Sequence, residues 1–287
     1  MLRAFAAVCI AYAVALAAAI GVARADPGDS ALCLAFAADV TATLVIFAFS
    51  ALFRNSSFYD AYWSVAPIAI GVYWIGAAES IGVDSRRQTV VLLLILWWGL
   101  RLTWNWARGW SGLAHEDWRY VRLQEQSGRA YWLVSFVGIH MVPTLVVFLG
   151  LLPVYAALSR GIEPWGVLDL VATAVTAAAI LCEQTADRQL LRFRRAKPDP
   201  AEILATGLWA RSRHPNYLGE IGFWWGLFLF GLAAHPAWWW SVVGALGITL
   251  LFRSVSLPMI ETRMLERRPT YAAHQKRVPL LVPRLLS

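Results

Sequence analysis

The chain has 287 residues, of which 59% are hydrophobic and 15% are charged, and its formal net charge is +7. Soluble globular domains are about half apolar and about one quarter charged, so this composition excludes an ordinary soluble domain and favours a membrane protein. Basic loops beside anionic lipid explain the positive charge without a nucleic-acid partner, and such loops also suit an anionic cofactor.

Eight apolar runs approach the length of about 20 helical residues that crosses a bilayer core. The first, 2–23, ends at Ala23-Arg24-Ala25, a pattern that also fits a signal-peptidase site. We expect a retained helix, because the run is long for a signal peptide. The others are 31–53, 62–81, 88–106, 131–158, 165–186, 217–234 and 237–260. The sequence therefore predicts an all-α, polytopic transmembrane helix bundle of seven or eight spans, forming a single membrane domain over 1–287.

Basic residues gather in alternate connecting segments, which is typical of cytoplasmic loops under the positive-inside rule. Three polar segments, 108–130, 183–216 and 261–284, carry most of them. With eight spans, all three segments face the cytoplasm together with both termini. A site assembled from these three segments is therefore predicted at the cytoplasmic face.

The stretch 53–63, FRNSSFYDAYW, brings Asp60 to the start of the third predicted helix. An aspartate there is a good helix cap. It also suits a substrate-binding carboxyl among Tyr59, Tyr62 and Trp63. The residues alone leave both interpretations open.

The stretch 98–120 places Arg101 inside an apolar run, with Asn105 and Arg108 on nearby faces. Arg108 is close enough to the end of the run to reach the interface by snorkelling. Arg101 lies deeper, so a functional role is favoured for it.

The sixth predicted helix ends with Glu183 and Asp187, which are four residues apart and so share a face. A basic run that includes Arg194 and Arg195 follows. Solvated charges at a helix end are the plain interpretation. The alternative places Asp187 on ribose or amide groups and the arginines on phosphates.

The stretch 207–220, GLWARSRHPNYLGE, predicts a helix that begins at Pro215, because proline suits the first helical position and His214 before it is pushed out of α geometry. Helix N-termini bind anions, and Arg211 and Arg213 stand just before this one, suited to bidentate phosphate contacts. Glu220 lies one turn inside an apolar helix, where a carboxylate is costly. A functional site is favoured here over a packing face.

Asn216 and Tyr217 are at helical spacing from Glu220 and share its face. After the last predicted span, Glu261 and Arg263 look back toward the same end of the bundle, although a plain basic tail is the alternative. The three cysteines form no C-x-x-C pair and the sequence has no H-E-x-x-H motif, so we expect neither a disulfide framework nor a metal site.

Together, these motifs resemble the membrane reductases of the steroid 5α-reductase type, and most closely a bacterial branch of them. GLWARSRHPNYLGE is preceded by EQTADRQLLRFRR and followed by ETRMLERRPTY, and sterol C14- and Δ7-reductases carry a related segment. The similarity covers 97–284, whereas 1–96 matches weakly. The resemblance implies an enzyme of the bacterial inner membrane that binds NADPH in a cytoplasm-facing cavity. It further implies reduction of an activated carbon–carbon double bond in a hydrophobic lipid or steroid-like substrate.

The resemblance also assigns residues to the cofactor. Asn216, Tyr217 and Glu220 match the family's N-Y-x-G-E and are expected near the nicotinamide. Asp187 matches an aspartate before a basic run, in which Arg194 is expected to contact phosphate. The complete predicted cofactor set is Asp187, Arg194, Arg195, Arg211, Arg213, His214, Asn216, Tyr217, Glu220, Arg108, Glu261 and Arg263.

On the substrate side, Asp60 stands where the steroid enzymes carry a glutamate, and Trp98 where they carry a tyrosine, with Arg101 nearby. These three residues are the predicted catalytic set. An indole N–H donates a hydrogen bond but does not release a proton as a phenol does. The identity of the lipid is therefore less defined than the cofactor.

Two other functions fit parts of the sequence. Isoprenylcysteine carboxyl methyltransferases share the R-H-P-x-Y-x-G helix start and a charged C-terminal tail. The arginine-rich segment 188–197 favours a cofactor with phosphates, which S-adenosylmethionine lacks. The third interpretation is a non-catalytic lipid-binding membrane protein with the same fold.

Overall fold

The computed structural model describes residues 1–25, 30–80, 82–196, 199–268 and 270–283. These residues form helices and connecting loops, with no strand among them, which confirms the predicted all-α fold. The longer helices are α1 (Leu2–Ala25), α2 (Ala31–Phe53), α3 (Tyr62–Gly76), α4 (Ser85–Gly109), α7 (Val142–Tyr155), α8 (Val167–Arg195), α9 (Pro215–Ala234) and α10 (Val242–Leu251). Shorter helices are α5 (Trp118–Ser127), α6 (Tyr131–Val134), α11 (Leu257–Arg267) and α12 (Tyr271–Arg277).

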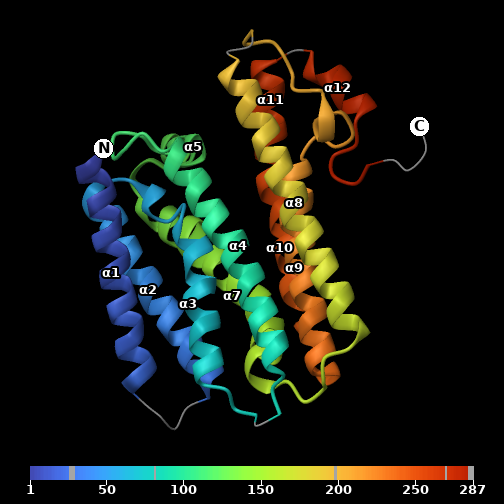
Figure 1. Cartoon of the computed structure of the whole chain (residues 1–287). Helices are drawn as coiled ribbons and strands as arrows, with labels where there is room; N and C mark the ends of the chain where they lie inside the picture. The colour runs from blue at the N-terminus through green and yellow to red at the C-terminus, as the bar shows by residue number, and fades with distance from the viewer. Residues whose placement is uncertain (26–29, 81, 197–198, 269, 284–287) are drawn as a thin grey trace.

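Seven helical stretches of the described residues are long and apolar enough to cross a membrane. They are Leu2–Arg24, Ala31–Phe53, Ser85–Gly109, Trp118–Arg160, Val167–Arg195, Pro215–Ala234 and Pro236–Arg267. Helix α3, with 15 residues, falls short of that length, yet it lies among the long helices of the bundle (Figure 1). The predicted count of seven or eight thus depends on α3. The N-terminus lies at the same end of the bundle as α5, α11 and α12 (Figure 1).

Two glycines let α9 approach α8 closely. A Cβ on Gly219 would lie 2.7 Å from the carbonyl oxygen of Ala179 and 2.8 Å from the backbone nitrogen of Glu183. A Cβ on Gly226 would overlap Thr176. Only a residue without a side chain fits such contacts with backbone. The start of α9 is thereby pressed against the polar end of α8.

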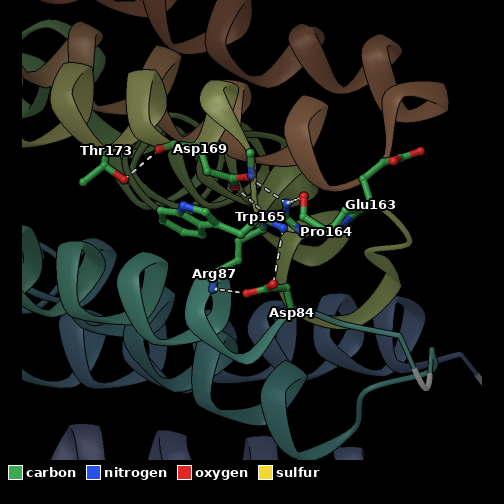
Figure 2. A network of polar contacts seen from close by, with 8 residues as sticks. Asp84, Arg87, Glu163, Pro164, Trp165, Asp169 and Thr173 are labelled. Atoms are coloured by element: carbon green, nitrogen blue, oxygen red, sulfur yellow. Dashed lines mark hydrogen bonds and ion pairs between the residues drawn. The ribbon is translucent and has the colours of Figure 1, made fainter.

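The opposite end of the bundle is held by a buried ion pair between α4 and α8 (Figure 2). Arg87 is 0% exposed, and its Nε and Nη2 lie 2.6 and 2.8 Å from the two carboxylate oxygens of Asp169. Its remaining donors reach the carbonyl oxygens of Glu163 and Pro164. Because every charged atom of the pair has a partner, this network fixes the spacing of α4 and α8.

The chain between α2 and α3 is irregular and buried. Asn55 to Tyr59, which include the short η1 (Ser56–Phe58), are at most 3% exposed. Tyr12 donates a hydrogen bond to the carbonyl oxygen of Phe58 (2.9 Å). Tyr12 is ten residues into α1, so this contact lies about 15 Å from the start of that helix. Helix α3 therefore begins inside the bundle, which explains why it is short.

Candidate polar site between α4, α8 and α9

Arg101 lies between two carboxylates of α8. Its Nη2 is 2.5 Å from Oε2 of Glu183, and its Nη1 is 2.8 Å from Oδ2 of Asp187. Asn105, one turn further along α4, donates to the same oxygen of Asp187 at 2.9 Å. We refer to these four residues, with Glu220 and Trp98, as the Arg101 cluster.

Glu220 joins the cluster from α9. It is 4% exposed, and its two carboxylate oxygens accept hydrogen bonds from the indole N–H groups of Trp98 (2.9 Å) and Trp224 (2.8 Å). Trp98 is 0% exposed and stacks on Phe223 with the ring centroids 4.5 Å apart. Buried carboxylates need such donors, because an unpaired one would be costly at this depth. Trp98 thus holds Glu220 in place.

The Arg101 cluster contains more acidic than basic groups. Three carboxylates, from Glu183, Asp187 and Glu220, lie around the guanidinium of Arg101. An acidic excess repels a phosphate but accepts hydrogen bonds from hydroxyl and amide N–H groups. The cluster is therefore suited to the neutral, polar parts of a ligand.

The start of α9 adds a free acceptor to this region. Helix α9 begins at Pro215, and His214 before it has non-helical φ and ψ of −138° and 64°, as the sequence predicted. The side-chain oxygen of Asn216 is buried and has no hydrogen-bond partner in the described part of the chain. Tyr217 packs edge-on against Phe252 of the last span, with ring centroids 5.1 Å apart.

A second network, the Glu261 network, ties the start of α9 to α11 and α12. Arg213 Nη1 and His214 Nε2 each lie 2.6 Å from a carboxylate oxygen of Glu261. Tyr271 and Gln275 of α12 donate to the same carboxylate at 2.6 and 2.7 Å. Arg213, His214 and Glu261, three of the predicted cofactor ligands, are thus engaged with one another.

The other predicted cofactor ligands lie around these networks. Arg108 donates to Asn105 at 3.0 Å, which places it beside the Arg101 cluster. The guanidinium of Arg263 lies 3.9 Å from the ring centroid of Trp118. Three arginines with exposed side chains remain for contact with an anion: Arg194, Arg195 and Arg211.

Asp60 lies in the irregular segment before α3. It does not cap that helix, whose first turn has no side-chain cap. Instead, its carboxylate accepts a hydrogen bond from Tyr120 of α5 at 2.6 Å. Burial raises the pKa of Asp60 to about 6, although the hydrogen bond from Tyr120 acts to lower it. Of the predicted catalytic set, Arg101 and Trp98 are on neighbouring turns of α4. Asp60 precedes α3, and Trp63 in the first turn of α3 packs against Trp98 with the ring centroids 5.6 Å apart.

One buried pair of polar residues lies outside the predicted site. Asp39 of α2 is 5% exposed and accepts a hydrogen bond from the hydroxyl of Tyr62 at 2.9 Å. The position of Asp39 inside the long apolar run 31–53 indicates such a site, since a carboxylate inside an apolar run is uncommon. Among the described residues, no group of three or more His, Cys, Asp or Glu side chains is arranged to hold a metal ion.

The sequence of the chain is similar to that of a known protein and matches a protein family. The chain is 28% identical over 263 residues to the uncharacterized protein C594.04c of Schizosaccharomyces pombe, covering 84% of this chain and 76% of that protein. No solved structure matches the chain with significance. A family described as a protein of unknown function, DUF1295, matches residues 46–278, a range that begins well before the predicted boundary at 97 and includes both networks. The chain therefore belongs to the DUF1295 family, a family of membrane proteins related to steroid 5α-reductases.

Proposed function

We propose that this protein is a membrane-embedded, NADPH-dependent reductase of a carbon–carbon double bond in a lipid or steroid-like enone. One observation carries the proposal: residues from α4, α8 and α9 that are distant in sequence form a single buried polar cluster. Trp98 and Glu220, joined by a hydrogen bond, are 122 residues apart, and Arg101 and Asp187 are 86 apart. Buried ionisable groups within membrane helices are expensive and are usually functional.

The residues fit the parts of NADPH by their chemistry. The unpaired side-chain oxygen of Asn216 suits the carboxamide N–H of the nicotinamide. Asp187 and Asn105 suit the hydroxyls of a ribose. Arg194, Arg195 and Arg211 supply exposed guanidinium groups for the phosphates. Arg213, His214 and Glu261 then fix the start of α9 rather than contact the cofactor.

NADPH, when bound, would supply the hydride that reduces the β-carbon of the enone. The residues of the chain would stabilise the negative charge that develops on the carbonyl oxygen. Two donors are available for that charge, the carboxyl of Asp60 and the guanidinium of Arg101. Asp60 has a pKa of about 6, so a fraction of it holds a proton near neutral pH. A proton taken up from solvent at the α-carbon completes the reduction.

The proposal places this chemistry at the cytoplasmic face of a bacterial inner membrane. The polar segments 108–130 and 261–284, which are rich in arginine, include α5 and α12, and these helices lie at the same end of the bundle as the N-terminus (Figure 1). Cytoplasmic loops are enriched in such residues. NADPH is available on that side.

Ligand binding to the purified protein tests the proposal. We expect NADPH, and not S-adenosylmethionine, to raise the melting temperature, and the protein to oxidise NADPH with a member of a panel of lipophilic enones. Asn216→Ala and Arg194→Ala should each weaken NADPH binding by about tenfold, since each removes a hydrogen bond or charge contact. Arg129→Ala, which removes an exposed arginine outside both networks, is the control. Stabilisation by S-adenosylmethionine alone, or by neither compound, contradicts the proposal.

A further inference from the structure

Arg253 occupies an unusual position on the outer face of the last span. It lies in η7 (Phe252–Ser256), a π-helical turn between α10 and α11. Leu246 and Leu250 precede it at helical spacing and are 43% and 61% exposed, so this face is turned toward lipid. Among the described residues, no carboxylate pairs with Arg253. A charged side chain on a lipid-facing surface is costly within the hydrocarbon. It is stabilised when it extends to the membrane interface and pairs there with a negative charge.

A pocket of about 230 Å³ adjoins this arginine. The pocket combines two guanidinium groups and one carboxylate with apolar walls. Arg213 enters it with a buried Nε that has no hydrogen-bond partner in the described part of the chain, while its Nη1 is paired with Glu261. The lining residues are Arg213, Arg253, Leu257, Pro258, Glu261 and Leu280.

The pocket lies where the membrane-crossing part of the bundle ends. Tyr217, in the first turn of α9, packs against Phe252, the neighbour of Arg253. The C-terminal segment forms one wall, because the backbone N–H of Arg213 donates to the carbonyl oxygen of Pro279 at 3.0 Å. Helix starts of membrane spans are at the level of the lipid head groups.

The charges in the pocket select a class of ligand. Glu261 also accepts hydrogen bonds from His214, Tyr271 and Gln275, so its carboxylate is fully engaged. Two guanidinium groups and one carboxylate leave one net positive charge, which matches a phosphodiester monoanion. The apolar side chains of Leu257, Pro258 and Leu280 suit the glycerol and acyl parts that adjoin such a phosphate.

We propose that this pocket binds the phosphodiester of an anionic phospholipid from the surrounding bilayer, with Arg253 and Arg213 contacting the phosphate. The lipid is a bound component of the membrane and not the substrate of the reductase. The inference is independent of NADPH, because lipid binding is measured without it.

Native mass spectrometry of the purified protein tests this assignment. Phosphatidylglycerol, phosphatidylcholine or inorganic phosphate is added to wild type, to Arg253→Gln and to a control, Arg129→Gln, which changes another exposed arginine. We expect wild type and the control to retain phosphatidylglycerol at least about tenfold better than phosphatidylcholine, and Arg253→Gln to lose that preference. The melting temperatures without lipid should agree, since the Arg253 side chain is exposed.

Three results would overturn the assignment. The first is that Arg253→Gln retains phosphatidylglycerol as wild type does. The second is that wild type binds the two lipids equally. The third is that inorganic phosphate displaces the lipid, because the pocket would then be a site for a soluble phosphate.

Discussion

At the scale of single residues, Asp60 has a carboxyl group whose pKa differs between the folded and the unfolded protein. Its pKa is raised to about 6 from an ordinary value of 3.8, chiefly by burial. A carboxyl with a raised pKa stabilises the folded state below pH 4, and that contribution is lost as the pH rises through 6. The two-unit difference corresponds to about 3 kcal/mol, which solvent screening of this half-buried group reduces to about 1–2 kcal/mol.

Asp60→Asn should therefore stabilise the protein at high pH. The amide keeps an acceptor for Tyr120 and removes the charge. We expect its melting temperature to exceed that of wild type by a few degrees at pH 8 and to equal it at pH 4. Asp199→Asn, at an exposed aspartate, serves as the comparison. An identical shift at both pH values would rule out titration of Asp60 as the cause.

The sequence anticipated several of these polar residues but not their partners. In the sequence, Glu220 stands out as a carboxylate one turn inside an apolar helix, and Arg101 as a cation inside another. That Glu220 binds Trp98 and Trp224, and that Arg101 binds Glu183, depends on how α4, α8 and α9 pack. Local spacing carries no information about contacts between helices that are far apart in the chain.

At the scale of elements, the buried pair of Arg87 and Asp169 joins α4 to α8 at the end opposite the termini (Figure 2). Arg87→Met should cost about 3–5 kcal/mol of unfolding free energy, because it leaves the buried carboxylate of Asp169 without its counter-charge. Arg160→Met removes a more exposed ion pair with Glu79 and should cost about 0–1 kcal/mol. The two variants are compared by thermal or denaturant unfolding in one detergent. Equal costs would show that burial of the pair does not matter.

The contact of α8 with α9 gives a second expectation. Gly219→Ala should destabilise the protein by about 1–3 kcal/mol, since the new methyl group meets the backbone of Ala179 and Glu183. It should also weaken NADPH binding, because it displaces Glu183 and with it the Arg101 cluster. Gly247→Ala, whose nearest neighbour would be 3.9 Å away in Val146, is the matched control. Equal behaviour of the two variants in unfolding assays would contradict the packing argument.

The helix boundaries show where composition is a sufficient guide. Helix α2 spans 31–53 as predicted, because lipid requires an apolar run of that length. Helix α8 continues to Arg195, beyond the predicted end at 186, because charged residues also form helix once they leave the lipid. Helix α3 ends at Gly76, before the predicted 81, and its start within the bundle depends on contacts from α1 and α5.

At the scale of the whole molecule, the arrangement of termini predicts the topology. We predict that α3 is an eighth crossing, because the N-terminus and the last helix, α12, lie at the same end of the bundle, which an even number of crossings produces (Figure 1). We expect tags at the N- and C-termini to be protected from protease in right-side-out vesicles and cleaved in inverted ones. Accessibility of one tag from each side would show that α3 does not cross.

The irregular segment before α3 also affects how the helices insert into the membrane during synthesis. The backbone N–H of Ser56 is bound by Glu116, and the side chain of Asn55 by the carbonyl oxygens of Leu113 and His115. These partners are translated almost sixty residues later, and lipid offers no substitute for them. We therefore expect the third helix to reach its final position only after the loop that follows the fourth helix has been synthesised.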